Sequence, residues 1–218
     1  MIYKLLDKLK LSKKANKDEN EDFLNKAIDI NRNDVFALVP YSNISHNMSN
    51  LALENKIMPF PNFETVNFSH NFDWTYKHHK NEVSYQLYLQ SLRIVSACVT
   101  TFEQTNDKRY LHKGFEITES WMSFVDQGKS TEMTWYDHPT ANRVQVLIQL
   151  IYHLKDNNIE YNENKYFDML IKHSEFLMSD ENYRKNNHGI MMDKSLLVLG
   201  YVTSVSYTHL TLPTTPYV

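Results

Sequence analysis

The sequence has few of the residues that mark nucleotide-binding and disulfide-bonded folds. Its 218 residues include four glycines, at positions 114, 128, 189 and 200, and one cysteine, Cys98. Such scattered glycines form neither GxGxxG nor GxxxxGK(S/T), so we do not expect a nucleotide-dependent enzyme of the usual kinds. One cysteine excludes an intramolecular disulfide. Its position in the apolar run 94–99 predicts a buried thiol and not a nucleophile.

Long apolar runs and an excess of charge of one sign are also missing. No stretch approaches the roughly 20 apolar residues of a membrane span, so we expect none. Residues 1–14 mix apolar side chains with five lysines and Asp7, which does not fit a secretory signal, so we expect a cytoplasmic location. The formal net charge of −3 gives no basic field that would favour nucleic acid.

Apolar residues follow a helical period from residue 80 onward, and helix starts recur about every 25–30 residues. We expect a first helix with the stripe Val83, Leu87, Ile94, Cys98 and Phe102. Further helices are expected after Asp107, from His138-Pro139 with Asp137 as cap, over residues 163–178, and from near Asn187. This spacing predicts an all-α fold of stacked antiparallel helix pairs, as in solenoids and helical toroids.

The first 70 residues have a different character. Residues 1–20 are rich in lysine, asparagine and glutamate and predict a solvated arm, and residues 21–31 could form a short helix. Residues 32–72 contain three prolines and many asparagines and serines, which predicts mostly irregular chain. We therefore divide the chain into an N-terminal arm and lead-in (1–70) and a helical domain (71–204).

The last fourteen residues differ from the Asn/Lys/Tyr-rich chain before them. Residues 205–214 read VSYTHLTLPT, which resembles one translated frame of a transposase-type sequencing adapter. The adapter bases that follow an index tag would encode Val218 and a stop codon. We therefore interpret 205–218 as an artefact, exclude it from the fold, and expect the natural gene to continue past Ser204.

Three segments together resemble the helical domain of heparinase II/III-like polysaccharide lyases. The first runs from FDWT at 72–75 through YQLYL at 85–89 to TNDKRY at 105–110. The second is WYDHPTANR at 135–143, and the third is Asn187-His188-Gly189 at a helix start. Their order extends the resemblance over about residues 60–203. It implies part of an incomplete (α/α) toroid, which in this family precedes a β-sandwich.

The resemblance implies β-elimination at a uronic acid of an acidic polysaccharide, without a cofactor or metal. Asn187 would bind the uronate carboxylate, and His188 would neutralise it or act as the base. Gly189 would let the chain pass close to the substrate. The family's catalytic tyrosine and a further histidine would lie beyond Ser204, so we expect the 218-residue chain to be inactive.

A second group of residues is a candidate for substrate binding. Arg143 could contact carboxylates or sulfates through its planar fork, and Tyr136 and His138 could face the groove. The alternative is that His138 caps its helix and Arg143 pairs with a carboxylate. Trp74, like Trp135, could stack on a sugar ring or pack in the core.

Other functions stay open on the sequence alone. The helical domain could be a non-catalytic module that binds a glycan or a protein. It could also be a toroid glycoside hydrolase with Asp137 and Asp193 as the carboxylates, although nothing in their context singles them out. His78-His79 and His112 lack any recognised metal-ligand spacing, so we expect solvated histidines.

Overall fold

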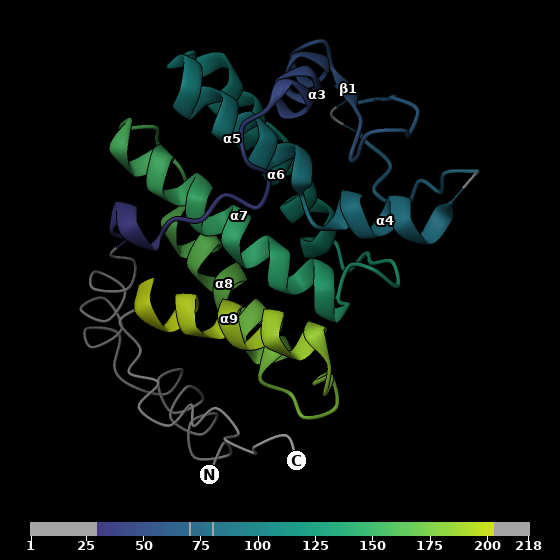
Figure 1. The fold of residues 1–218 in the computed structure, drawn as a ribbon, viewed down its shortest axis with the longest axis vertical. Helices are drawn as coiled ribbons and strands as arrows, with labels where there is room; N and C mark the ends of the chain where they lie inside the picture. The colour runs from purple at the N-terminus through teal and green to yellow at the C-terminus, as the bar shows by residue number, and fades with distance from the viewer. Residues whose placement is uncertain (1–29, 70, 80, 203–218) are drawn as a thin grey trace.

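The computed structural model describes residues 30–69, 71–79 and 81–202 (Figure 1). The elements, in order, are η1 (Arg32–Asp34), α3 (Asn43–Leu53), β1 (Lys56–Ile57), β2 (Val66–Asn67), α4 (Glu82–Gln90), α5 (Arg93–Thr105), α6 (Lys108–Asp126), α7 (Asp137–Asp156), α8 (Glu163–Leu177) and α9 (Asn187–Val202). The strands β1 and β2 form one short antiparallel pair, with Lys56 opposite Asn67. The predicted all-α class is confirmed. Among the described helices, none has the length and apolar character needed to cross a membrane.

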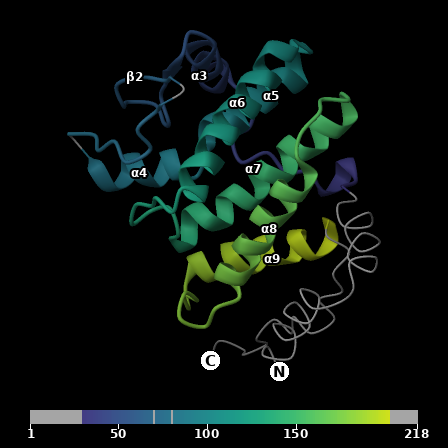
Figure 2. The same ribbon diagram turned by 180° about the vertical axis from the view of Figure 1, so that it is seen from behind.

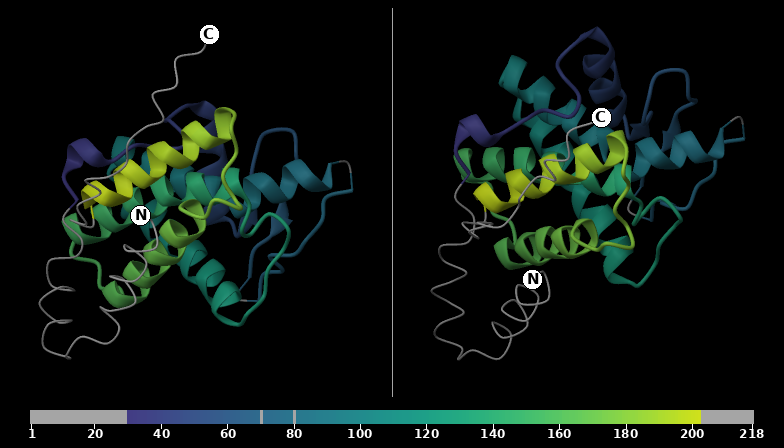
Figure 3. Two further views of the ribbon diagram at one scale, coloured as in Figure 1. Left: turned by 90° about the horizontal axis from the view of Figure 1, so that it is seen from below. Right: turned by 60° about the horizontal axis from the view of Figure 1, so that its bottom comes forward.

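Helix α7 lies at the centre of the molecule. It packs against the α5–α6 pair on one side and against α8 and α9 on the other (Figures 1 and 2). Seen from below, α9 lies over α7 (Figure 3). Almost every residue of α7 from Pro139 to Leu154 is buried, as expected from its apolar residues on more than one face.

Local sequence signals explain most helix ends. Asp107 caps α6 by accepting a hydrogen bond from the backbone N–H of Arg109, and Asn162 caps α8 through the N–H of Lys165. Gly128 follows α6 with a φ of +73°, a conformation that glycine adopts without steric cost. Helix α7 differs from the expectation, because Asp137 is its first helical residue and Tyr136 occupies the cap position.

The expected first helix is in fact two helices. The chain breaks at Ser91-Leu92, where Leu92 has a φ of +53°. A left-handed leucine costs about 1–2 kcal/mol, but Leu92 is fully buried in the core, which offsets that cost. The break turns α4 away from the axis of α5 and leaves Val83 exposed, so the predicted continuous stripe was wrong there.

The lead-in is more ordered than its composition predicts. Residues 43–53 form α3, which begins with a capping box between Ser42 and Ser45. Val39, Met48, Ile57 and Phe68 belong to the same core cluster as the helices that follow, so the described lead-in is not a separate unit. The short helix expected at 21–31 lies almost entirely outside the described residues.

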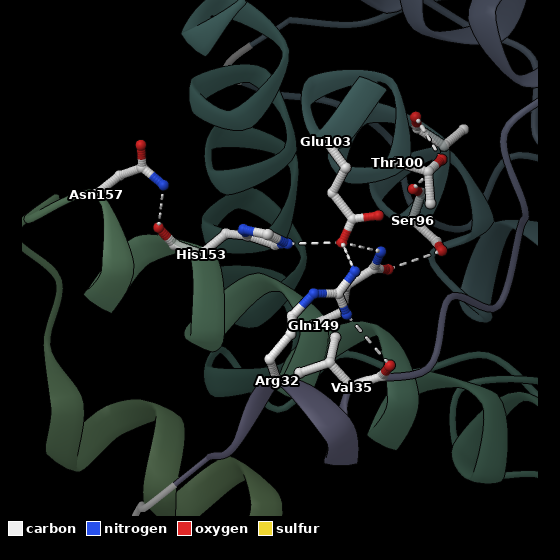
Figure 4. A network of polar contacts seen from close by, with 9 residues as sticks. Arg32, Val35, Ser96, Thr100, Glu103, Gln149, His153 and Asn157 are labelled. Atoms are coloured by element: carbon white, nitrogen blue, oxygen red, sulfur yellow. Dashed lines mark hydrogen bonds and ion pairs between the residues drawn. The ribbon is translucent and has the colours of Figure 1, made fainter. Parts of the chain in front are cut away.

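A polar network holds η1 against α5 and α7 (Figure 4). The Oε1 atom of Glu103 lies 2.6 Å from Nε2 of His153 and 3.4 Å from a guanidinium nitrogen of Arg32. Burial alone would raise the pKa of Glu103, but its hydrogen bond to His153 and the charges of His153 and Arg32 hold that pKa below its ordinary value. Ser96 completes the link by accepting from the N–H of Val39 and donating to Gln149.

Candidate functional site

Two of the three motif segments meet where α7 and α9 begin. The first residues of these helices lie side by side at the same end of the molecule (Figures 1 and 2). There Nδ1 of His188 lies 3.1 Å from Oδ1 of Asp137, and the rings of His188 and His138 are 5.5 Å apart between centroids. Residues about 50 positions apart in the chain therefore form one cluster.

Asp137 is the buried centre of this cluster. Its Oδ1 atom accepts hydrogen bonds from the backbone N–H of His138 and from His188, and its Oδ2 atom lies 3.5 Å from Nε of Arg184. An ionised carboxylate can only accept, so Nδ1 of His188 must carry a proton. In the neutral ring the lone pair is then on Nε2, which is the tautomer that a general base requires.

Positively polarised groups surround the Asp137 carboxylate in this cluster. The N-terminal ends of α7 and α9 carry the positive ends of their helix dipoles, and Arg184 contributes a guanidinium that is half-exposed. Burial lowers the pKa of His138 below 6.5, and the neighbouring His188 lowers it further, so His138 is neutral at pH 7. A neutral His138 can donate a hydrogen bond to a ligand or accept one from it.

Asn187 is exposed at the first position of α9. The capping role belongs to Asn186, whose Oδ1 atom accepts a hydrogen bond from the backbone N–H of His188 at 2.9 Å. Within the described part of the chain, the side chain of Asn187 has no hydrogen-bond partner. Its amide is therefore available to a ligand.

Gly189 is required by close packing. A Cβ atom at this position would lie 2.0 Å from the backbone oxygen of Arg184 and 3.1 Å from the ring of Tyr183. We expect Gly189→Ala to force the 183–186 turn away from α9 and to lower the free energy of unfolding by about 1–3 kcal/mol. Urea unfolding measures this, with Gly128→Asn as control because a Cβ at position 128 would have no atom within 4 Å and asparagine tolerates a positive φ. Equal losses in the two variants would contradict it.

Two of the predicted substrate ligands lie in the core. Trp74 is 1% exposed, and its indole N–H donates to the hydroxyl of Ser120. Arg143 is completely buried, so the proposed contact of either side chain with a sugar is wrong in this structure. Tyr136 and His138 are half-buried at the start of α7, and the ring of His138 is close enough to that of His188 for both to contact the same ligand.

Among the described residues, Arg143 has no carboxylate partner, so the alternative expectation of an ion pair is not met there. Its guanidinium donates to the carbonyl oxygens of Gln90 and Thr134, to the hydroxyl of Thr140 and to Nε2 of His173. It also lies over the rings of Trp121 and Trp135, at 4.6 and 5.4 Å from their centroids. Burial lowers the pKa of Arg143 to about 9, so the side chain is still charged at neutral pH.

The position of Gln90 explains how this charge is stabilised. Gln90 is the last residue of α4, where the break at Leu92 leaves its carbonyl oxygen free to accept from Arg143. The negative end of the α4 dipole thus faces the guanidinium. Arg143 therefore joins α4, α7, α8 and the 130–136 loop.

The contacts of Arg143 with His173 require that His173 is neutral, which makes the stability of the folded chain depend on pH. Its Nε2 atom accepts from Arg143 at 3.0 Å, so its proton must be on Nδ1, which donates to the carbonyl of Met169 at 2.7 Å. Complete burial and then the charge of Arg143 hold the pKa of His173 well below 6.5, with a smaller effect from Lys172. The rings of Trp121 and Trp135 complete its surroundings.

We therefore expect the folded state to lose stability as the pH falls through 6.5. Below that pH the unfolded chain binds a proton at residue 173 that the folded chain excludes, which costs up to about 1.4 kcal/mol per pH unit. His173→Gln should flatten the curve of unfolding free energy against pH between about pH 6.5 and 5. The exposed His112→Gln serves as control. A variant curve parallel to that of the unchanged chain would contradict the assignment.

The sequence does not predict the roles of several residues in and near the site. Asp137 is expected there only as a cap or as a possible hydrolase carboxylate, and nothing in the sequence singles out His173. A charged residue three positions before the motif's asparagine is the one local signal for Arg184. A cavity of about 540 Å³ lies elsewhere, lined by Phe72, Trp74, Glu119 and Ser120 among others. It shares no residue with the His188 cluster.

Comparisons with known proteins agree with the motifs. The family model described as "Heparinase II/III N-terminus" matches residues 4–203. Two crystal structures of heparan sulfate lyase HepC from Pedobacter heparinus, one of them a mutant, superpose with a TM-score of 0.61 each. The mutant is 17% identical over 76% of this chain, and the other is 16% identical over 89%.

The likeness to HepC at this identity is a likeness of fold. The matched part of this chain spans 27% of the length of the mutant HepC and 30% of the other. No curated protein sequence matches the chain. The family match covers nearly the whole sequence and includes both segments of the His188 cluster. The chain therefore belongs to the heparinase II/III family of polysaccharide lyases, matching the N-terminal region of that family.

Proposed function

We propose that the longer protein to which this chain belongs cleaves a uronic-acid-containing polysaccharide, heparan- or alginate-like, by β-elimination. The observation that carries the proposal is the pairing of His188 with Asp137 beside the available amide of Asn187. HepC acts on heparan sulfate by its name, which supports an acidic polysaccharide as the substrate class.

The first requirement of this reaction is to neutralise the substrate carboxylate. Removing the C5 proton places a second negative charge next to that carboxylate, so the proton is only weakly acidic. The Asn187 amide can donate to the carboxylate without adding a competing charge. Arg184 and the two helix N-termini lower the energy of the dianionic intermediate.

The second requirement is a base and an acid. Nε2 of His188, with Asp137 holding Nδ1–H, can take the C5 proton; for the other epimer at C5, a protonated His188 would instead neutralise the carboxylate. The C4–O bond then breaks, a C4=C5 double bond forms, and the departing oxygen takes a proton. The resemblance to the family implies that the donor of that proton is a tyrosine beyond residue 204.

The decisive experiment uses the full-length gene product with heparan sulfate, heparin and alginate. Formation of the unsaturated uronate is followed by its ultraviolet absorbance. We expect turnover of at least one polymer by the full-length protein and none by the 218-residue chain alone. Tight binding of a polymer without unsaturated product would instead favour the non-catalytic module, and turnover by the short chain would overturn the expectation that it is inactive.

A further inference from the structure

Three potential metal ligands meet outside the His188 cluster. Glu64 lies in the connection between β1 and β2, and His78 and His79 lie just before α4. One carboxylate oxygen and one ring nitrogen from each histidine all lie within 4.8 Å of one another. The Nε2 atom of His79 is 3.9 Å from Oε1 of Glu64. The sequence did not predict this group, because the glutamate is 14 positions upstream of the histidine pair.

The three side chains differ in how firmly they are held. His78 is 1% exposed, which corrects the expectation that it is solvated. Its ring stacks on Tyr85 at an interplanar angle of 16° and meets the edge of Phe63 at 4.9 Å between centroids. The side chains of His79 and Glu64 are 60% and 63% exposed. One ligand is thus fixed by packing, while the other two can adjust without disturbing the core.

We propose that Glu64, His78 and His79 form a binding site for Zn²⁺ or a similar transition metal ion, with a fourth position open to solvent. Two imidazoles and one carboxylate are a ligand set that zinc commonly takes, at about 2.0–2.2 Å from each donor atom. Ligand atoms around a tetrahedral ion lie about 3.3–3.5 Å apart, so a small inward movement of His79 and Glu64 completes the site. The nearby ammonium of Lys77 pairs with Glu82, which limits its competition for Glu64.

Metal binding here would join two stretches of irregular chain. Glu64 belongs to the β1–β2 connection, and the histidines belong to the segment that follows Trp74. Imidazole ligands favour zinc over magnesium and calcium. The inference rests on the geometry of these three residues and does not depend on the proposed lyase activity.

The test is titration of the purified, untagged 218-residue chain with ZnCl₂, followed by calorimetry. We expect one Zn²⁺ bound per chain, and we expect His79→Ala and Glu64→Gln each to weaken binding at least about tenfold. Both variants change exposed side chains, so folding should be preserved. His112→Ala, which removes an exposed histidine from α6, is the matched control and should bind Zn²⁺ unchanged.

Two further measurements make the outcome decisive. Zn²⁺ should raise the thermal unfolding midpoint of the unchanged chain but not that of His79→Ala, because a ligand that binds only the folded state stabilises it. It should also protect His79, and not His112, from acylation by diethylpyrocarbonate. Unchanged stoichiometry and affinity in His79→Ala and Glu64→Gln would overturn the proposal, as would equal binding of Ca²⁺.

Discussion

Replacing Asn187 and His188 by alanine in the full-length protein should nearly abolish lyase turnover. A positioned base contributes about 10²–10⁴-fold, and a donor aimed at developing charge contributes about 10²–10³-fold. We therefore expect kcat to fall at least about 10²-fold in either single variant. The double variant should lose less than the product of the two effects, because the residues act on the same intermediate. Initial rates of unsaturated uronate formation measure the change.

Controls separate this effect from a loss of folding. Asn187 is exposed, so its substitution should leave the thermal unfolding midpoint almost unchanged. Asn164→Ala on the outside of α8 and His112→Ala on α6 remove the same chemical groups from exposed positions and should retain full activity. Retained turnover in the double variant would refute the role given to the pair and, with it, the proposed mechanism.

Among the substitutions considered, Arg143→Ala should cause the largest fall in the free energy of unfolding. The variant leaves the carbonyl oxygens of Gln90 and Thr134 buried without their donor and opens a cavity between Trp121 and Trp135. Each buried unsatisfied acceptor costs about 1–3 kcal/mol, so we expect a total loss of about 3–5 kcal/mol. Urea unfolding of the 218-residue chain measures the loss.

Arg109 provides the matched control. Its guanidinium is exposed and pairs with Asp107, and an exposed pair of this kind contributes little to stability. Arg109→Ala should therefore leave the unfolding midpoint almost unchanged. Arg143→Lys should recover only part of the loss, because an ammonium cannot serve the planar set of partners that the guanidinium contacts. A midpoint for Arg143→Ala equal to that of Arg109→Ala would mean that Arg143 is not the support described above.

Local signals predicted the later helices well. Asp107 and Gly128 bracket α6, and the apolar residues of α7 indicated burial on several faces. The break at Leu92 could not be predicted in this way, because apolar residues continue through it and the left-handed turn is stabilised by burial of Leu92 in the folded protein. For α3, the Ser42–Ser45 capping box was a local signal, but asparagines and serines obscured it.

The residues of the candidate site were likewise predicted only in part from the sequence. The sequence motif predicted a site at Asn187 and His188, and the described structure leaves Asn187 available to a ligand. The partner of His188 was not predictable, because Asp137 lies 51 positions earlier and meets it only through the packing of α7 against α9. For Arg143, its charge suggested contact with a sugar anion or a carboxylate, whereas its partners include carbonyl groups and aromatic rings from α4, α6 and the 130–136 loop. The residue type of Arg143 does not reveal these contacts, because they form only when distant parts of the chain pack together.

The single cysteine offers a way to follow opening of the helix pack. Cys98 is fully buried on α5, and its Cβ would lie 3.5 Å from a Cβ added at Gly114 of α6. Burial raises the pKa of its thiol to about 12. A maleimide dye can therefore react only after α5 separates from the helices that cover Cys98, which include α6 at Gly114 and α3 at Ser49. Because no second thiol competes for the reagent, the labelling rate of the native chain reads out directly how often this interface opens.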